Sequence, residues 1–230
     1  SEKPIDSLLL YIDRNSKLTS VEIPNSKNGD DVSKFQHLWY RLEKPLLPQQ
    51  KMKMSFSFQS SWSSFKGHTA FNSIIENGSF MRISRYFPSF GYQDSNEISS
   101  EKERAKRHLP NQTPLKKLDD KSKISNDFTD YETIVSTSKN QTAIGIGDLV
   151  GNWKKGDRNY FHYRSYGKIP FRFAFASAEY EIKKTKYKGV SIEVYFDKRH
   201  SRNVAKLIQV VKNTLNYCQD NFGKYPYKTI

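Results

Sequence analysis

The chain has 230 residues, of which 14% are aromatic, and 38 Lys and Arg against 24 Asp and Glu give a formal net charge of +14. This length is enough for one large or two small domains, and the 15 Phe and 14 Tyr favour sheet over helix. No stretch approaches the about 18 apolar residues that span a membrane. The apolar patch in Ser1–Ser16 is short and flanked by charges, so we expect no signal peptide.

The excess of positive charge raises the question of a nucleic-acid partner. The lysines are spread along the whole chain, and the densest cluster, Lys183–Lys188, is interpreted as a polar turn between two strands. No RNA-binding signature and no basic helix with clustered arginines is present. We therefore expect no nucleic-acid binding and interpret the charge as a surface bias.

The first third of the sequence alternates as antiparallel strands do. Met52, Met54, Phe56 and Phe58 alternate with Lys and Ser, which indicates one buried and one solvated face. These four residues belong to the expected strand Lys51–Gln59. The other expected strands in this third are Leu8–Ile12, Leu18–Ile23 and Phe35–Glu43. Such a pattern is typical of a sandwich or a saddle-shaped sheet.

The middle of the chain combines strands, a short helix and a loop. Ala70–Tyr92 contains two apolar strands around Asn77-Gly78, a dipeptide suited to turns or bulges. Ser100 and Glu103 have capping-box spacing, which predicts a short helix within Ser99–Arg107. The polar residues 108–127 predict a flexible loop.

Strand patterns then resume and end in a long helix. We expect strands at Tyr131–Ser138, Gln141–Gly147, Gly151–Ser165, Phe171–Lys183 and Val190–Asp197, with Lys154–Asp157 as a hairpin tip. The helix spans Ser201–Phe222, and its apolar stripe consists of Val204, Leu207, Ile208, Val211, Leu215 and Cys218. If a partner domain is missing, this stripe should be partly exposed or covered by another copy.

No residues carry a recognisable active site. The five histidines, His37, His68, His108, His162 and His200, include no local ligand pair, and H-E-x-x-H is absent. There is no G-x-S-x-G nucleophile, and the glycines of Gly145–Gly151 fit a strand and turn better than a phosphate loop. The single cysteine, Cys218, excludes an internal disulfide and is interpreted as a buried structural thiol.

Several stretches resemble one known family in order. "IIENGSFMRISRYFPSFGYQDSNEIS", "YETIVSTSKNQTAIGIGDLVGNWKKGDRNYFHYRS", "FAFASAEYEI" and "VSIEVYFDKRHSRNVAKLIQVVKNTLNYCQDNFGKYPY" look like the N-terminal part of zinc aminopeptidases of the alanyl-aminopeptidase (gluzincin) family. The sequence is most similar to the bacterial branch in which such a peptidase is fused to an ABC-type permease. The resemblance extends over nearly the whole chain from about Leu8.

The resemblance implies a mainly β, saddle-like or sandwich domain of antiparallel sheets with one long C-terminal helix. Residues 1–199 would form the β-rich domain, and residues 200–230 the helix and first strand leading into a missing catalytic domain. The family's G-x-M-E-N and H-E-x-x-H segments are absent, so this chain would be a non-enzyme without a cofactor, and zinc would belong to the missing domain. Its expected partners are that domain, peptide N-termini and a permease segment on the extracytoplasmic (periplasmic) side of a bacterial membrane.

The β domain of such peptidases provides one wall of the substrate cleft. The resemblance places Glu76 and Asn77 at the positions that bind the substrate amino group, and Tyr92 at the cleft wall. The alternative for Asn77 is a turn without a ligand, and for Tyr92 a packed aromatic. A different function class also stays open, namely a free-standing carbohydrate- or protein-binding β module that uses Trp39, Trp62 and Trp153.

Overall fold

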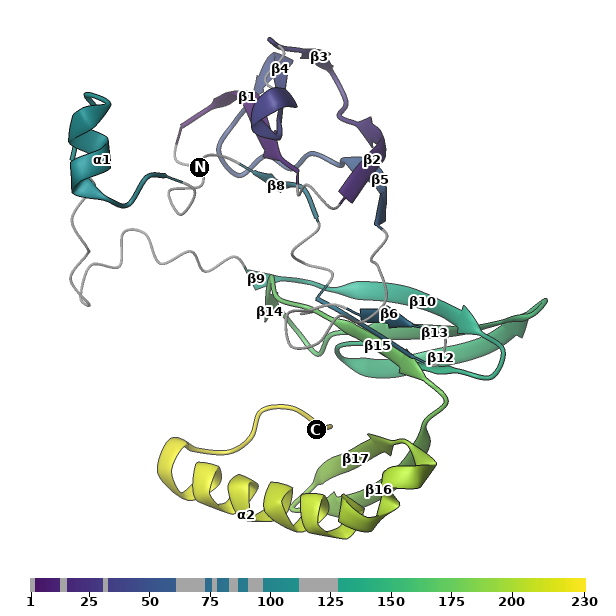
Figure 1. Cartoon of the computed structure of the whole chain (residues 1–230). Helices are drawn as coiled ribbons and strands as arrows, with labels where there is room; N and C mark the ends of the chain where they lie inside the picture. Colours follow the sequence, from purple (N-terminus) through teal and green to yellow (C-terminus); the bar gives the residue numbers. More distant parts are fainter. Residues whose placement is uncertain are drawn as a thin grey trace. The chain divides into compact units, whose positions relative to one another are not determined.

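The structure is a computed structural model that describes residues 3–12, 16–30, 33–60, 73–75, 78–82, 87–90, 97–111 and 128–230. Antiparallel strands dominate, and one long helix lies near the C-terminus (Figure 1). The expected mainly β fold class is confirmed. The chain divides into two compact units, Ser1–Ser60 with Tyr86–Asn126, and Ser61–Arg85 with Asp127–Ile230.

Unit 1 contains the sheet β3-β4-β1-β8 and the two-stranded sheet β2-β5. Their bounds are Ile5–Tyr11 (β1), Ser16–Glu22 (β2), Ser26–Asn28 (β3), His37–Leu46 (β4), Ser55–Ser60 (β5) and Ser89–Phe90 (β8), with a 3-10 turn at Ser33–Phe35. The predicted alternation is confirmed in β5, where Phe56 and Phe58 each pack edge-on against Phe87. The strand begins later than expected, because residues 51–54 form no ladder.

The predicted short helix is α1, Glu101–Lys106. The Glu103 amide donates to the Ser100 hydroxyl, which confirms the N-terminal cap. Arg104 is 5% exposed because its guanidinium donates to the Glu97 carboxylate and to the carbonyls of Ile98 and Pro110. A buried charge is tolerated only when it is paired and hydrogen-bonded, and Arg104 meets that condition.

Unit 2 contains the sheets β10-β13-β12, β11-β15-β7-β6, β14-β9 and β16-β17. Their bounds are Ser73–Ile75 (β6), Gly78–Met81 (β7), Phe128–Thr129 (β9), Glu132–Ser138 (β10), Thr142–Ile144 (β11), Asp148–Lys155 (β12), Arg158–Arg164 (β13), Ile169–Pro170 (β14), Phe175–Ala178 (β15), Glu181–Tyr187 (β16) and Val190–Phe196 (β17). Lys154–Asp157 forms the tip of the β12–β13 hairpin, as predicted.

One core of this unit lies between β11 and β13. Ala143, Phe161 and Tyr163 form a buried cluster, and the Tyr163 hydroxyl donates to the Ala143 carbonyl at 2.8 Å. Gly145 and Gly147 make the bend that leads into β12, so the strand-and-turn interpretation of these glycines is confirmed. A Cβ atom on Gly145 would lie 2.8 Å from the Tyr163 ring, so this bend packs closely on β13.

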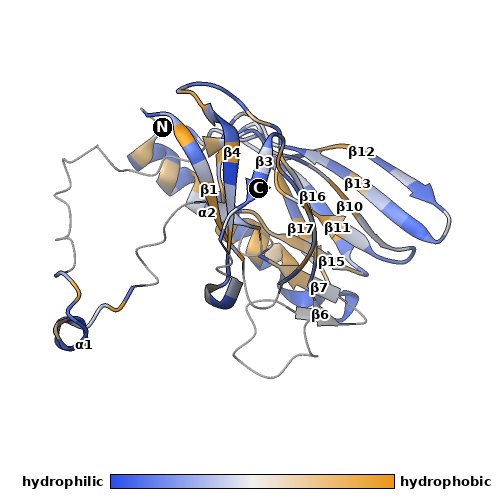
Figure 2. Ribbon diagram, turned by 90° about the horizontal axis from the view of Figure 1, so that it is seen from above, coloured by the Kyte–Doolittle hydropathy of each residue, from blue (hydrophilic) through white to orange (hydrophobic). Residues whose placement is uncertain are grey.

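The second core joins the β16–β17 hairpin to helix α2, Val204–Phe222, which follows a 3-10 turn at Lys198–Asn203. Val190, Ile192 and Leu215 are buried together at its centre. Hydrophobic positions recur along α2 in Figure 2, and the helix packs one apolar face on β17. In the part of the chain that the structure describes, no helix combines the length and apolar character that a membrane crossing requires.

The predicted stripe on α2 is only partly covered. Leu215 is 3% exposed, whereas Leu207 on the same stripe is 50% exposed. Leu207, Val210 and Tyr217, all at least half exposed, continue the apolar surface on the side away from β17. We call these three residues the apolar flank.

Two local predictions are wrong. Lys183–Lys188 is not a turn, because residues up to Tyr187 belong to β16 and the turn lies at Lys188-Gly189, where both residues have positive φ. The expected strand Phe171–Lys183 is split between β15 and β16, because the first part pairs with β7 and β11 and the second with β17. The two parts therefore belong to different sheets.

Glu193 of β17 carries a pH-dependent contribution to stability. Burial raises the pKa of its carboxyl, but hydrogen bonds donated by Lys184 and Tyr195, each 2.7 Å, and the Lys184 charge bring the net pKa below its ordinary value. A carboxyl with a depressed pKa in the folded state stabilises the fold above its ordinary pKa. This stabilisation is lost as the pH falls through the depressed value.

Replacing Lys184 by methionine should therefore raise the Glu193 pKa, because only the hydrogen bond from Tyr195 then opposes the effect of burial. Carbon-13 carboxyl NMR titration measures this pKa, and urea unfolding should show a lower stability at neutral pH. Lys186→Met is the control, because Lys186 lies two residues along the same exposed strand and makes no ion pair with a described residue. Equal Glu193 titration curves for the two variants would contradict the assignment.

Candidate functional site

The residues that the family resemblance selects lie outside the described residues. These are Glu76, Asn77 and Tyr92. In the sequence, Glu76 and Asn77 lie between β6 and β7, which pair in an antiparallel hairpin with Ile75 opposite Gly78. The predicted recognition of a substrate amine by these residues stays a prediction.

The described residues contain no group of three His, Cys, Asp or Glu side chains that could hold a metal ion. His162 contacts a carboxylate, with its Nε2 at 2.6 Å from Glu132, but Arg164 of the same strand also donates to that carboxylate at 2.8 Å. This cluster offers one carboxylate that already accepts a hydrogen bond from Arg164 and contacts the His162 ring. The two potential ligands His162 and Glu132 are fewer than the three or four that a zinc site requires.

The remaining candidates differ in exposure. Trp39 is covered by the Arg41 guanidinium and by the Gly29 backbone, where a Cβ atom would lie 3.0 Å from the indole. Trp153 is 41% exposed and stacks on Tyr160 with ring centroids 5.4 Å apart, and Trp62 lies outside the described residues. Cys218 is half-buried, so its thiol is less buried than predicted.

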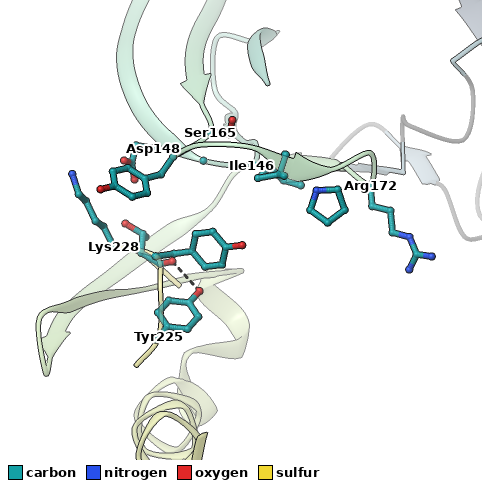
Figure 3. A pocket seen from close by; sticks show the side chains of 12 residues that line it. Ile146, Asp148, Ser165, Arg172, Tyr225 and Lys228 are labelled. Atoms are coloured by element: carbon teal, nitrogen blue, oxygen red, sulfur yellow. Dashed lines mark hydrogen bonds between the residues drawn. The ribbon is translucent and has the colours of Figure 1, made fainter. Parts of the chain in front are cut away.

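A pocket of about 340 Å³ lies entirely within unit 2 (Figure 3). Its lining comes from three segments, residues 146–148 at the bend before β12, residues 165–172 around β14, and residues 225–229 after α2. This volume is in the range of small-molecule sites. Because Tyr166, Tyr225 and Tyr227 all line it, we call it the tyrosine pocket.

The C-terminal wall of the tyrosine pocket runs beside β17 and forms one isolated parallel bridge with it, between Thr229 and Ser191. Gly223 ends α2 with a positive φ, and the chain then returns along β17. The Ser191 amide donates to the Lys228 carbonyl at 2.8 Å, and the amides of Ile230 and Glu193 complete the ladder at 2.9 Å each. These bonds hold residues 225–229 in place as a wall of the pocket.

The pocket combines an apolar floor with charged groups at its rim. Ile169, which is 6% exposed, lies with Ile146 and Pro170 among the lining residues. Burial, with a smaller contribution from Tyr227, raises the pKa of Tyr225, so its hydroxyl remains a donor at neutral pH and bonds the Thr229 carbonyl. Such a mixture suits a small ligand with both an apolar group and charges.

Solved structures with a similar fold match the full length of the chain. The chain matches an M1 zinc metallopeptidase mutant from Deinococcus radiodurans, bound to a Tyr-Ser-Ala substrate, with a TM-score of 0.65, 10% identity and coverage of 100% of this chain and 48% of that one. The chain has the fold of about half of an M1 zinc metallopeptidase. The M1 zinc metallopeptidase from Deinococcus radiodurans gives a TM-score of 0.64 at 11% identity, and a two-domain M1 mutant bound to L-arginine gives 0.63 at 12%, with the same coverage.

The chain thus spans about half the length of the M1 structures it matches. Neither a protein-family model nor a curated protein sequence matches it. At this identity the M1 likeness establishes the fold.

The sequence alone did not reveal the tyrosine pocket. The sequence predicts a strand and turn at Gly145–Gly151, and a helix followed by a strand in residues 200–230. Neither prediction places the two segments together, because the pocket joins residues 146–148 to residues 225–229 through the bonds between β17 and residues 228–230. Long-range pairing of this kind leaves no local periodicity.

Proposed function

We propose that the chain is the non-catalytic N-terminal β domain of an M1-type zinc aminopeptidase-like protein, in which it forms one wall of the peptide-binding cleft. The observation that carries this proposal is the match of the whole chain to 48% of an M1 zinc metallopeptidase.

The apolar flank supports a second domain as the partner. Leu207, Val210 and Tyr217 form an exposed apolar strip along a helix whose other apolar face is already buried on β17. Large apolar side chains gathered on one exposed face mark interaction surfaces. In the proposed function the catalytic domain of the same polypeptide covers this strip.

Reading the parent gene beyond the Ile230 codon tests the proposal directly. The reading frame should continue into a segment with G-x-M-E-N and H-E-x-x-H, whereas a stop codon at that point would contradict the proposal. In this longer protein, replacing Leu207 and Val210 together by aspartate should lower peptidase activity, because charges would enter the interface between the domains. In the 230-residue chain the same pair should change stability by no more than about 1 kcal/mol, since both side chains are exposed.

Replacing Ala205 and Gln209 together by aspartate is the matched control for the double variant, because it introduces the same two charges at exposed positions on the other side of α2. This control should keep the peptidase activity of the longer protein. Full activity of the Leu207/Val210 double variant would show that the flank is not the domain interface.

Glu76 and Asn77 are proposed to bind the amino group of the peptide substrate, and Tyr92 to line the cleft. This part of the proposal rests on the sequence resemblance.

We also propose that the parent protein is attached to the extracytoplasmic side of a bacterial membrane through a permease segment. The support for this location is the resemblance to the permease-fused branch. Protease added to spheroplasts should then degrade the tagged chain, and full protection would contradict this location.

A further inference from the structure

The tyrosine pocket has no role in the proposed function, yet it has the features of a binding site. Its walls are held by backbone hydrogen bonds between β17 and residues 228–230 and by Ser165, whose hydroxyl accepts from the Tyr131 amide and donates to the Gly167 carbonyl. All lining residues belong to unit 2. The pocket therefore exists in the chain without any contribution from another domain.

Among the described residues, no opposite charge pairs with Asp148 or Lys228 of the pocket. Asp148 and Lys228 both line it, and neither makes an ion pair with any residue that the structure describes. The Lys228 ammonium lies 4.9 Å from the centroid of the Tyr166 ring, which holds it at the pocket by a cation–π contact. Figure 3 shows Asp148 and Lys228 toward one side of the pocket and Arg172 toward the other.

This arrangement selects one class of ligand. A free α-amino acid carries its ammonium and its carboxylate on the same carbon atom, so it needs an anionic and a cationic group at one end of a site. Asp148 supplies the first and Lys228 the second. The apolar floor of Ile146 and Ile169, with the ring of Tyr227, then accepts a side chain without charge.

The geometry points to a binding site for a free α-amino acid with an apolar or aromatic side chain. Its ammonium binds the Asp148 carboxylate, its carboxylate binds the Lys228 ammonium, and its side chain lies on the apolar floor between Ile169 and Tyr227. The inference stands on the pocket alone and does not require the proposed peptidase partnership. Where that partnership holds, the ligand belongs to the class of products that an aminopeptidase releases.

The test is a titration of the 230-residue chain with L-phenylalanine, followed by amide NMR shifts and by calorimetry. A ligand of this size is expected to bind with a dissociation constant of about 1 mM. N-acetyl-L-phenylalanine lacks the ammonium and L-phenylalanine amide lacks the carboxylate, so each should bind about tenfold more weakly. These comparisons use the unchanged protein, so they do not depend on the folding of any variant.

Paired substitutions then locate the site. Asp148→Asn and Lys228→Gln should each weaken L-phenylalanine binding about tenfold. Asp157→Asn, at the hairpin tip, and Lys224→Gln, in the same tail but outside the pocket lining, should leave it unchanged. The inference is overturned if no saturable shift occurs up to about 10 mM ligand. It is also overturned if N-acetyl-L-phenylalanine binds as tightly as the free amino acid, or if Asp148→Asn has no effect.

Discussion

Replacing Gly147 by alanine is expected to destabilise unit 2 by about 3 kcal/mol. Gly147 has a φ of +98°, in the region where a Cβ atom is strained, and an alanine Cβ would lie 2.2 Å from the Arg164 carbonyl oxygen. Because the obstacle is backbone, it cannot rotate away as a side chain would. The bend before β12 or the end of β13 must then shift. Urea unfolding followed by circular dichroism measures the loss through the transition midpoint.

Gly151→Ala is the matched control for this substitution. Gly151 lies four residues further along the chain, has no positive φ, and a Cβ atom there would meet nothing within 4 Å. Alanine at such a position restricts the unfolded chain and should leave stability unchanged or raise it by about 0.5 kcal/mol. If Gly147→Ala and Gly151→Ala lost the same stability, the contact of the added Cβ atom with the Arg164 backbone would not explain the effect at Gly147.

The second large effect is expected for Leu215→Ala, with a loss of about 3 kcal/mol. Leu215 is 3% exposed and packs with Val190 and Ile192 between α2 and β17. Truncation leaves a cavity that these side chains fill only in part. Since the chain consists of two units, hydrogen exchange of the α2 and β17 amides is the appropriate measurement, because it reports this core separately.

Leu207→Ala provides the comparison within the same helix. It removes the same atoms from a side chain that is 50% exposed, so the expected change in stability is about 0.5 kcal/mol or less. The helix propensity of both positions changes equally, because both residues become alanine. If exchange in β17 accelerated equally in both variants, the packing of Leu215 would not be the main support of this core.

Local patterns predicted most elements of the fold. The alternation in β5, the capping box of α1 and the three-four spacing on α2 each reflect short-range geometry, and each is confirmed. The same reasoning was wrong at Lys183–Lys188, where a high density of lysine was taken for a turn. In β16 the exposed lysines alternate with Thr185 and Tyr187, and only the pairing with β17 makes them a strand.

The candidate site was less accessible to sequence reasoning than the fold. The residues chosen by resemblance, Glu76, Asn77 and Tyr92, lie outside the described residues, so that part stays a prediction. The tyrosine pocket depends on where residues 228–230 pair, and nothing in "YPYKTI" specifies β17 as the partner strand. The strand with which residues 228–230 pair is decided by tertiary packing, because α2 separates them from β17 in the sequence, and periodicity does not indicate it.

The return of the chain along β17 has a thermodynamic consequence. Residues 225–229 form a wall of the tyrosine pocket and follow α2 in the chain, and β17, to which residues 228–230 are bonded, also carries the packing of α2 through Leu215. Occupancy of the pocket and docking of the helix are therefore linked equilibria. Any molecule that binds the pocket stabilises the docked helix, and by reciprocity a helix that is loosened weakens the binding of that molecule by the same free energy.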